Sequence, residues 1–240
     1  MGESHPPTES REFKEDDKED EPFPYTELDR IGLTQKDEDF KLHTWEDLRV
    51  IIGKRELAFC CTRSSFQCPT ISPAYTGQDT NKLDVLTRKP SDLRRYTSWC
   101  RQVKKEYGSV SDYVMQNRLP WGPPPFTYLS STPLAEPADY KILLNDWPYG
   151  FTDDITHIVV WSKTPIATEE VSGDVTPESR RVLSEFVKKT FVDRLGGDED
   201  RVLWFKNWVH LQSVRALEHF HVLVRHATKE DLEFWTGEHK

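Results

Sequence analysis

Residues 201–225 read RVLWFKNWVHLQSVRALEHFHVLVR, and this stretch predicts two β-strands joined by a polar connection. Alternate side chains of a strand share a face. One face of the second strand carries His219 and His221, about 7 Å apart by the ~3.3 Å rise per residue, with Arg225 further on. Such a face suits a bound phosphate or ester carbonyl, although two histidines on a half-exposed strand can also be merely solvated. The opposite face is apolar and we expect it to cover a core; it consists of Phe220, Val222 and Val224.

A second pair of strands is predicted upstream, at residues 141–145 (KILLN) and 155–162 (ITHIVVWS). The turn DWPYG at 146–150 separates them, so we expect a hairpin. His157 shares its face of the strand with apolar neighbours, which favours a hydrogen-bonded structural histidine over a catalyst. Between the two hairpins, the N-cap Thr176 followed by a proline predicts a helix that ends at Gly196. Thr228 caps a last short helix through Trp235.

The first half of the chain is predicted to be mostly helical. Thr44 as N-cap predicts a helix over 45–59, residues 61–83 are typical of a long loop, and further helices are expected over 91–108 and 111–118. The helix over 91–108 has basic outer faces in a body that is otherwise neutral. The alternative is an ordinary solvated helix face. The basic residues that we single out on it are Arg94, Arg95, Arg101, Lys104 and Lys105.

The order of these elements predicts an α+β fold, in which an antiparallel sheet with packed helices follows a helical N-terminal region. The first 40 residues hold 14 acidic and 5 basic residues, which leaves 27 of the 41 acidic and 27 of the 32 basic residues for the rest. Residues 1–25 are therefore expected to form a disordered acidic tail. We divide the remainder into a helical region with the basic helix at 26–130 and an α+β core at 131–240, with 26–240 forming one compact unit.

The composition also limits location and cofactors. No run of about 18 apolar residues occurs and the first ten residues are too polar for a secretory signal, so we expect no membrane span and a cytoplasmic location. The four cysteines form no CxxC pair and are expected to be reduced. We assign no metal and no cofactor, and the oligomeric state is left open.

Several of these features resemble the histidine-triad superfamily. The shared order is the turn at Asn145-Asp-Trp-Pro148, the strand that begins at His157, then Asn207, Ser213 and the His219-Phe-His221 run. The triad pattern has a further histidine where Leu217 stands, and Ser213 lies one residue further from the histidines than in the pattern. The resemblance implies a histidine-triad-like sheet in the second half of the chain and a nucleotide-like ligand.

A second resemblance covers nearly all of residues 40–235. The segments SDLRRYTSW, YGSVSDYVMQNRLPW, NDWPYGFTDDITHIVVWSK, WFKNW and LEHFHVLV are similar to a fungal family named for N-acetylglucosamine-induced proteins, whose members include arginine-containing cyclodipeptide synthases. The resemblance implies an aminoacyltransferase of secondary metabolism, which takes arginine and a second amino acid from aminoacyl-tRNAs and joins them as a diketopiperazine.

The residues can be matched to that chemistry on their own terms. Activation is stored in the tRNA ester, which agrees with a chain that has neither a GxxxxGK nor a GxGxxG phosphate loop. His219 or His221 can act as general base and Ser213 as acyl acceptor. The basic helix can bind the RNA. Candidate groups for the ribose or for the arginyl guanidinium are Asn145, Asp146, Asp153, Asp154 and Asn207, of which Asn207, like Ser213, can equally be a loop-capping residue.

Three functions remain as alternatives at this point. The first is a tRNA-dependent arginine-containing cyclodipeptide synthase, and the second is a histidine-triad-like nucleotide hydrolase or transferase. The third is a non-catalytic N-acetylglucosamine-response protein, which the incomplete triad and the acidic tail favour. The geometry around His219 and His221 separates them.

Overall fold

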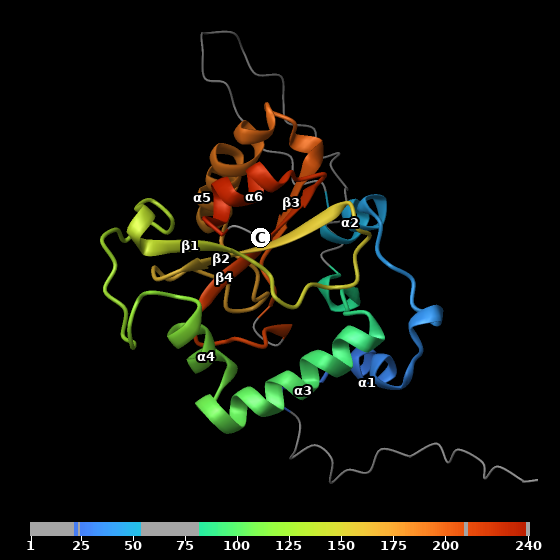
Figure 1. Ribbon diagram of the computed structural model, residues 1–240. Coiled ribbons are helices and arrows are strands. Elements are labelled where there is room, and N and C mark those ends of the chain that lie inside the picture. Colours follow the sequence, from blue (N-terminus) through green and yellow to red (C-terminus); the bar gives the residue numbers. More distant parts are fainter. Residues whose placement is uncertain (1–21, 24, 54–81, 209–210, 239–240) are drawn as a thin grey trace, which may run out of the picture.

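The computed structural model describes residues 22, 23, 25–53, 82–208 and 211–238. Within these ranges it has the α+β fold that the sequence predicts (Figure 1). The helices are α1 (Glu27–Thr34), α2 (Trp45–Ile52), α3 (Pro90–Tyr107), α4 (Val110–Asn117), α5 (Pro177–Val187) and α6 (Lys229–Thr236). The strands are β1 (Tyr140–Leu144), β2 (Ile155–Ser162), β3 (Val202–Phe205) and β4 (Glu218–Arg225). Single helical turns are η2 (Asp37–Asp39), η3 (Leu83–Val85), η4 (Pro137–Asp139), η5 (Lys188–Val192), η6 (Asp193–Leu195) and η7 (Glu199–Arg201).

The strands form a sheet in the order β1-β2-β4-β3, with every neighbouring pair antiparallel. The two predicted hairpins, β1–β2 and β3–β4, are both present, and the pairing of β2 with β4 joins them. Strand β4 is thus an inner strand. All of its residues from His219 to Val224 are buried, so the alternative of solvated histidines on a half-exposed strand is wrong: helices cover both faces of the sheet.

Helices α5 and α6 cover one face of the sheet, on the upper side in Figure 1. Their apolar stripes pack on the even-numbered residues of β4, as the alternation predicts. The fully buried Phe220 lies in this core, close to Phe186 of α5 and Trp204 of β3. After Val187 the chain continues through η5 and η6 to Gly196, whose φ of 76° ends the helical run.

The opposite face of the sheet is covered by the helices of the first half of the chain. Helix α2 packs against it through Trp45, Leu48 and Ile52. Helix α4 reaches the β1–β2 hairpin through Val114. This face also carries the odd-numbered residues of β4, including both histidines, and it forms the wall of the candidate site.

Local signals account for most helix ends. The predicted N-caps Thr44, Thr176 and Thr228 each accept a backbone hydrogen bond from the first helical turn. Helix α2 is shorter than the predicted 45–59, because Gly53 adopts a φ of 84° that a right-handed helix does not allow. The rest of that predicted span, and the predicted loop up to residue 81, lie outside the described residues.

The predicted acidic tail lies outside the described residues up to position 21. Its end is part of the fold, because the ring of Phe23 lies 4.9 Å from that of Tyr25 and 5.2 Å from that of Tyr96 on α3. The folded part therefore begins before residue 26. Among the described residues, no helix combines the length and the apolar character that a membrane crossing requires.

A close backbone approach at Gly150 connects the first half of the chain to the β1–β2 turn. Its carbonyl accepts from the backbone N–H of His43 at 2.9 Å, and its own N–H donates to the carbonyl of Thr87 at 2.9 Å. A Cβ at position 150 would lie 2.3 Å from the ring of Phe40. A larger residue there would require the ring of Phe40 to move, and the turn is held between two segments that lie far apart in the sequence.

We predict that Phe220→Ala lowers the free energy of unfolding by about 3–5 kcal/mol, because it empties the middle of the helix-covered core. Phe234→Ala is the matched control, since this ring is 63% exposed and lies beside the guanidinium of Arg194. Its cost should stay at about 1 kcal/mol or less. Chemical denaturation measures both, and equal losses would contradict the described core.

Candidate active site

A cavity lies on the histidine-bearing face of the sheet, between the sheet, helices α3 and α4, and the turn after β1. It holds about 730 Å³ of empty space, which includes the part open to solvent. Its wall combines aromatic, aliphatic and polar side chains. The aromatic residues that line it are Tyr96, Trp99, Tyr113, Trp147, Tyr149 and Trp161, and the polar ones include Arg88, Asn145, Asp146, Asn207, Gln212, Ser213, His219 and His221. A largely apolar cavity with a few converging polar groups is the usual form of a small-molecule site.

His219 has a defined tautomer in this cavity. Its Nδ1 lies 2.8 Å from the backbone carbonyl of Leu217, which only accepts hydrogen bonds, so Nδ1 carries the proton. The ring lies against Trp161, with 4.8 Å between the ring centroids. Nε2 keeps its lone pair and has no hydrogen-bond partner within the described part of the chain. His219 therefore offers a free basic nitrogen in a wall of the cavity.

His221 is the centre of a second arrangement, a hydrogen-bonded chain of side chains that joins two strands and two loops. Its Nδ1 lies 2.9 Å from Nε2 of His157, and its Nε2 lies 3.3 Å from the amide nitrogen of Asn207. An amide nitrogen only donates, so the proton of neutral His221 is on Nδ1 and is donated to His157. The register explains the contact, because His157 on β2 is diagonal to His221 on β4. The chain continues to the amide of Asn145, 3.3 Å from His157.

The two asparagines tie this chain to the turn after β1. Oδ1 of Asn145 accepts from the backbone N–H of Trp147 at 2.9 Å, and Nδ2 of Asn207 donates to the hydroxyl of Tyr149 at 2.9 Å. Asn207 is 5% exposed, and its Oδ1 is buried without a hydrogen-bond partner among the described residues. A buried acceptor of this kind is normally satisfied by water or ligand.

Burial sets the charge state of all three histidines. Removal from water disfavours the imidazolium, which lowers the pKa of His219 to about 4 and that of His157 to about 3. The pKa of His221 is also well below its ordinary value, first through burial and then through the neighbouring His157 and His219. The positive charge of Arg88 contributes to the low pKa of both His157 and His221. At neutral pH the cavity therefore presents uncharged imidazoles.

Most of the catalytic and substrate-binding residues predicted from the sequence come together in this cavity. Asn145, Asp146, Asn207, Ser213, His219 and His221 all line it. The side chain of Ser213 hydrogen-bonds to the phenol of Tyr96. Across the described ranges no hydrogen bond joins Ser213 to a histidine, so the contact that activates a serine nucleophile is not formed here.

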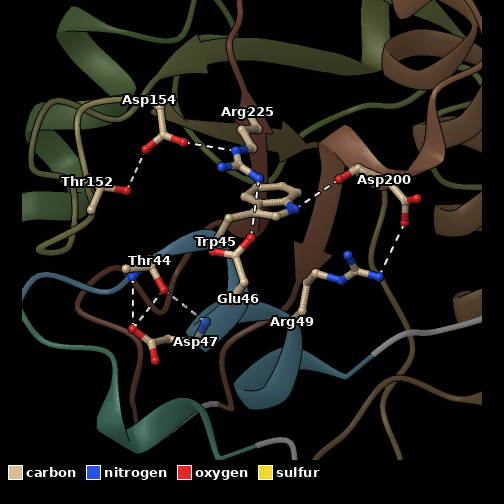
Figure 2. Close-up of polar contacts among 9 residues, drawn as sticks. All are labelled: Thr44, Trp45, Glu46, Asp47, Arg49, Thr152, Asp154, Asp200 and Arg225. Atoms are coloured by element: carbon tan, nitrogen blue, oxygen red, sulfur yellow. Dashed lines mark hydrogen bonds and ion pairs between the residues drawn. The ribbon is translucent and has the colours of Figure 1, made fainter.

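Asp153 and Asp154, which the sequence placed near the substrate, do not line the cavity. Figure 2 shows Asp154 directed at Arg225, with 2.9 Å between Oδ2 and the guanidinium Nε. Arg225 also pairs with Glu46 of α2 at 3.4 Å. The guanidinium that the sequence placed beside the histidines thus belongs to a separate network that fastens α2 to the end of the sheet, and the pKa of Asp154 is lowered there by Thr152 and Arg225.

The predicted basic residues of α3 fall into two groups. Arg94 donates to the backbone carbonyls of Leu33 and Gln35 and so fastens α1 to α3. Arg95 pairs with Asp92. The remaining three are exposed and form no ion pair with any residue that the structure describes; they are Arg101, Lys104 and Lys105.

Two polar site residues were not identified from the sequence. His157 was interpreted as a structural histidine; it is hydrogen-bonded as expected, but its partner is His221. Arg88 lies outside the predicted helix over 91–108, and its guanidinium carbon lies 3.9 Å from the ring centroid of Tyr96, in the cavity wall. The contact between His157 and His221 depends on the pairing of β2 with β4, which are not consecutive strands, so no local sequence pattern predicts it. Arg88 lies two residues before the start of α3, and this position in the sequence does not predict that its side chain lines the cavity.

Fold and site together define a class: an α+β protein whose antiparallel sheet is covered by helices on both faces, with neutral histidines lining a cavity on one of them. A solved structure described as "Crystal Structure of HTC1" is similar, with a TM-score of 0.51 and 24% sequence identity, and the match covers 64% of this chain and 85% of that chain. At this identity the likeness concerns the fold alone.

Sequence comparison identifies the family. Residues 77–225 match the model of the family "Protein of unknown function (DUF3605)", and the chain belongs to that family. N-acetylglucosamine-induced protein 1 of Candida albicans is 29% identical over 162 residues, and the match spans 60% of this chain and 63% of the relative's length. Uncharacterized protein YPL067C of Saccharomyces cerevisiae is 28% identical over 135 residues, which span 55% of this chain and 68% of that protein.

We predict that the buried histidines make the fold sensitive to acid. Their pKa values are lowered on folding from the ordinary 6.5, so the unfolded chain binds more protons below pH 6.5. The contribution of these histidines to the free energy of unfolding is fully present above pH 6.5. It is lost as the pH falls towards 4, at up to about 1.4 kcal/mol per pH unit for each histidine.

Denaturation at a series of pH values measures this slope. His219→Gln keeps a donor for the carbonyl of Leu217. It should make the dependence of the unfolding free energy on pH shallower by the contribution of one histidine. His226→Asn is the control, because His226 is exposed and asparagine tolerates its φ of 54°. A slope that does not change with His219→Gln would contradict the neutral buried state.

Proposed function

We propose that this protein is a cytoplasmic, tRNA-dependent aminoacyltransferase that condenses arginine with a second amino acid into a cyclodipeptide. The observation that carries the proposal is the cavity in which the free Nε2 of His219 meets Asn145, Asn207 and Ser213. The relative named for induction by N-acetylglucosamine agrees with the family resemblance from which the proposal comes. Substrates, partners and activity of the protein are all part of the proposal.

The proposed reaction requires a base but no activating nucleotide. The amine of one aminoacyl group attacks the ester carbonyl of the other, a C–N bond forms, and the C–O bond to the tRNA ribose breaks. The amine proton passes to Nε2 of His219 and from there to the leaving ribose oxygen. A second attack of the same kind closes the ring and releases the second tRNA. The low pKa of His219 keeps Nε2 unprotonated at neutral pH, so its lone pair is available to accept the proton.

Neighbouring side chains have positioning roles in this proposal. The unpartnered Oδ1 of Asn207 is an acceptor for the attacking amine or for a ribose hydroxyl. Asp146 is the one of the three proposed carboxylates that lines the cavity, and we assign it to the arginyl guanidinium. Arg118 already holds it, at 3.2 Å from Nε to Oδ2, so the substrate would share this carboxylate with Arg118. Ser213 stays a candidate acyl acceptor.

Helix α3 supports the choice of RNA as the carrier. It contributes Tyr96 and Trp99 to the cavity wall, while the exposed Arg101, Lys104 and Lys105 lie one to two turns further along the same helix. RNA bound to these cations would have its single-stranded end near the mouth of the cavity, where aromatic rings can stack on bases.

A second candidate function is a histidine-triad-like nucleotide hydrolase or transferase. The contact between His157, His221 and Asn207 favours it, because these residues follow the triad order in the chain. In this case His219 would attack a phosphorus atom instead of accepting an amine proton. The two candidates differ in whether tRNA is required.

We predict that the purified protein, supplied with arginine, mixed amino acids, aminoacyl-tRNA synthetases, tRNA and ATP, forms an arginyl diketopiperazine that mass spectrometry detects. His219→Asn should reduce its formation by about 10²-fold or more, since the general base is lost. His226→Asn, on the exposed position after β4, should have full activity. Product that persists after ribonuclease treatment would contradict the proposal, and so would its complete absence. Release of a mononucleotide from an aminoacyl adenylate without tRNA would favour the second candidate.

We further predict that the triple change Arg101→Glu, Lys104→Glu and Lys105→Glu weakens tRNA binding and makes it less dependent on salt, because fewer counterions are released. The matched control reverses three cations of the opposite side of the protein, Arg181, Lys188 and Lys189. Filter binding at several salt concentrations measures both variants. If the α3 variant and the control bind tRNA equally well, the basic face is only solvated surface.

A further inference from the structure

Arg88 is held firmly in the wall of the cavity. It lies in the extended segment between η3 and α3, and its Nε donates to the backbone carbonyl of Trp147 at 3.2 Å. Its guanidinium covers the ring of Tyr96 at 3.9 Å and lies 5.3 Å from the ring centroid of Tyr149. These contacts fix the plane of the Arg88 guanidinium and use only one of its five N–H donors.

Within the described part of the chain, no carboxylate compensates the charge of Arg88. Arg94, Arg118 and Arg225 all have a carboxylate within 4.0 Å. For Arg88 no such carboxylate exists among the residues that the structure describes, although its side chain is half-buried. A guanidinium that has lost part of its water without gaining a counter-ion is destabilising, unless a ligand provides the negative charge.

The surroundings of Arg88 narrow the class of ligand. A planar fork with free N–H groups matches the oxygens of a phosphate, to which it can donate two parallel hydrogen bonds. The rings of Trp99 and Trp147 line the same cavity, 5.3 Å apart, and offer flat faces for a base. The buried Oδ1 of Asn207 adds an acceptor for a hydroxyl group.

We propose that Arg88 binds the phosphate of a nucleotide whose base stacks on the aromatic wall formed by Trp99 and Trp147. The site lies in the same cavity as His219 and His221, so the nucleotide is delivered to the histidines. The inference rests on the proposed function in one respect, namely that the nucleotide is the 3′-terminal residue of an RNA chain. A free mononucleotide has the same chemistry and is the other source to be tested.

Titration calorimetry with adenosine 5′-monophosphate and with adenosine tests the site without any turnover. The wild-type protein should bind the monophosphate about tenfold more tightly or better, because a phosphate accepts charge-assisted hydrogen bonds that adenosine lacks. Arg88→Gln should remove this preference, and Arg88→Lys, which has the charge without the fork, should retain part of it. Arg181→Gln is the matched control on the exposed side of α5 and should behave as the wild type.

Equal binding of the two ligands by the wild type, or an unchanged preference in Arg88→Gln, would overturn the proposal. If Arg88→Gln does not fold, as a thermal scan shows, the wild-type comparison and Arg88→Lys decide. The trinucleotide CCA identifies the source: tighter binding than the monophosphate, lost in Arg88→Gln, indicates an RNA end, and weaker binding indicates a free nucleotide. If the protein prefers the phosphate but forms no diketopiperazine, the Arg88 site stands and the proposed synthase is discarded. If it forms diketopiperazine without a phosphate preference, the synthase stands and the Arg88 site is discarded.

Discussion

The free-energy cost of burying imidazoles is the constraint on which the site depends. His157, His219 and His221 lie between a sheet and its covering helices, where water cannot stabilise a positive charge. Each ring is therefore neutral, and a neutral ring has one donor and one acceptor that need partners of the right kind. The carbonyl of Leu217 and the amide of Asn207 are these partners, and they decide which nitrogen carries the proton. Nε2 of His219 is left free as a result.

Helix α3 connects this interior chemistry to the surface. One side of it supplies Tyr96 and Trp99 to the cavity, and its C-terminal turns expose Arg101, Lys104 and Lys105. Arg94 fastens α1 to the same helix. The orientation of α3 therefore fixes both the aromatic wall and the position of the exposed cations. A polyanionic partner bound on the outside and a small group bound inside would be aligned by one rigid element.

Local patterns predicted the elements well, since caps such as Thr44 and Thr228 and the strand alternation around Phe220 act within a few residues. The resemblance to the histidine-triad order, not a local pattern, predicted that the histidine-bearing strand, Asn145 and Asn207 belong to one site. Local patterns failed where contacts join distant segments. The pairing of β2 with β4 brings His157 to His221, the ion pair with Asp154 removes Arg225 from the site, and the stacking on Tyr96 places Arg88 in it. Burial of both faces of β4 depends on helices from the two halves of the chain, which the strand pattern does not contain.

The backbone hydrogen bonds at Gly150 show that the stretch matched by the family and the folding unit are not the same. The family match begins at residue 77, yet His43 is bonded to this turn, and Trp45 of α2 and Trp235 of α6 lie in the cores on either side of the sheet. Residues 77–225 expressed alone would expose both cores and release the turn that carries Asn145. Family boundaries drawn from sequence similarity thus understate the piece of chain that must be kept intact for biochemical work, and a soluble fragment would have to start upstream of α2 and run to the end of α6.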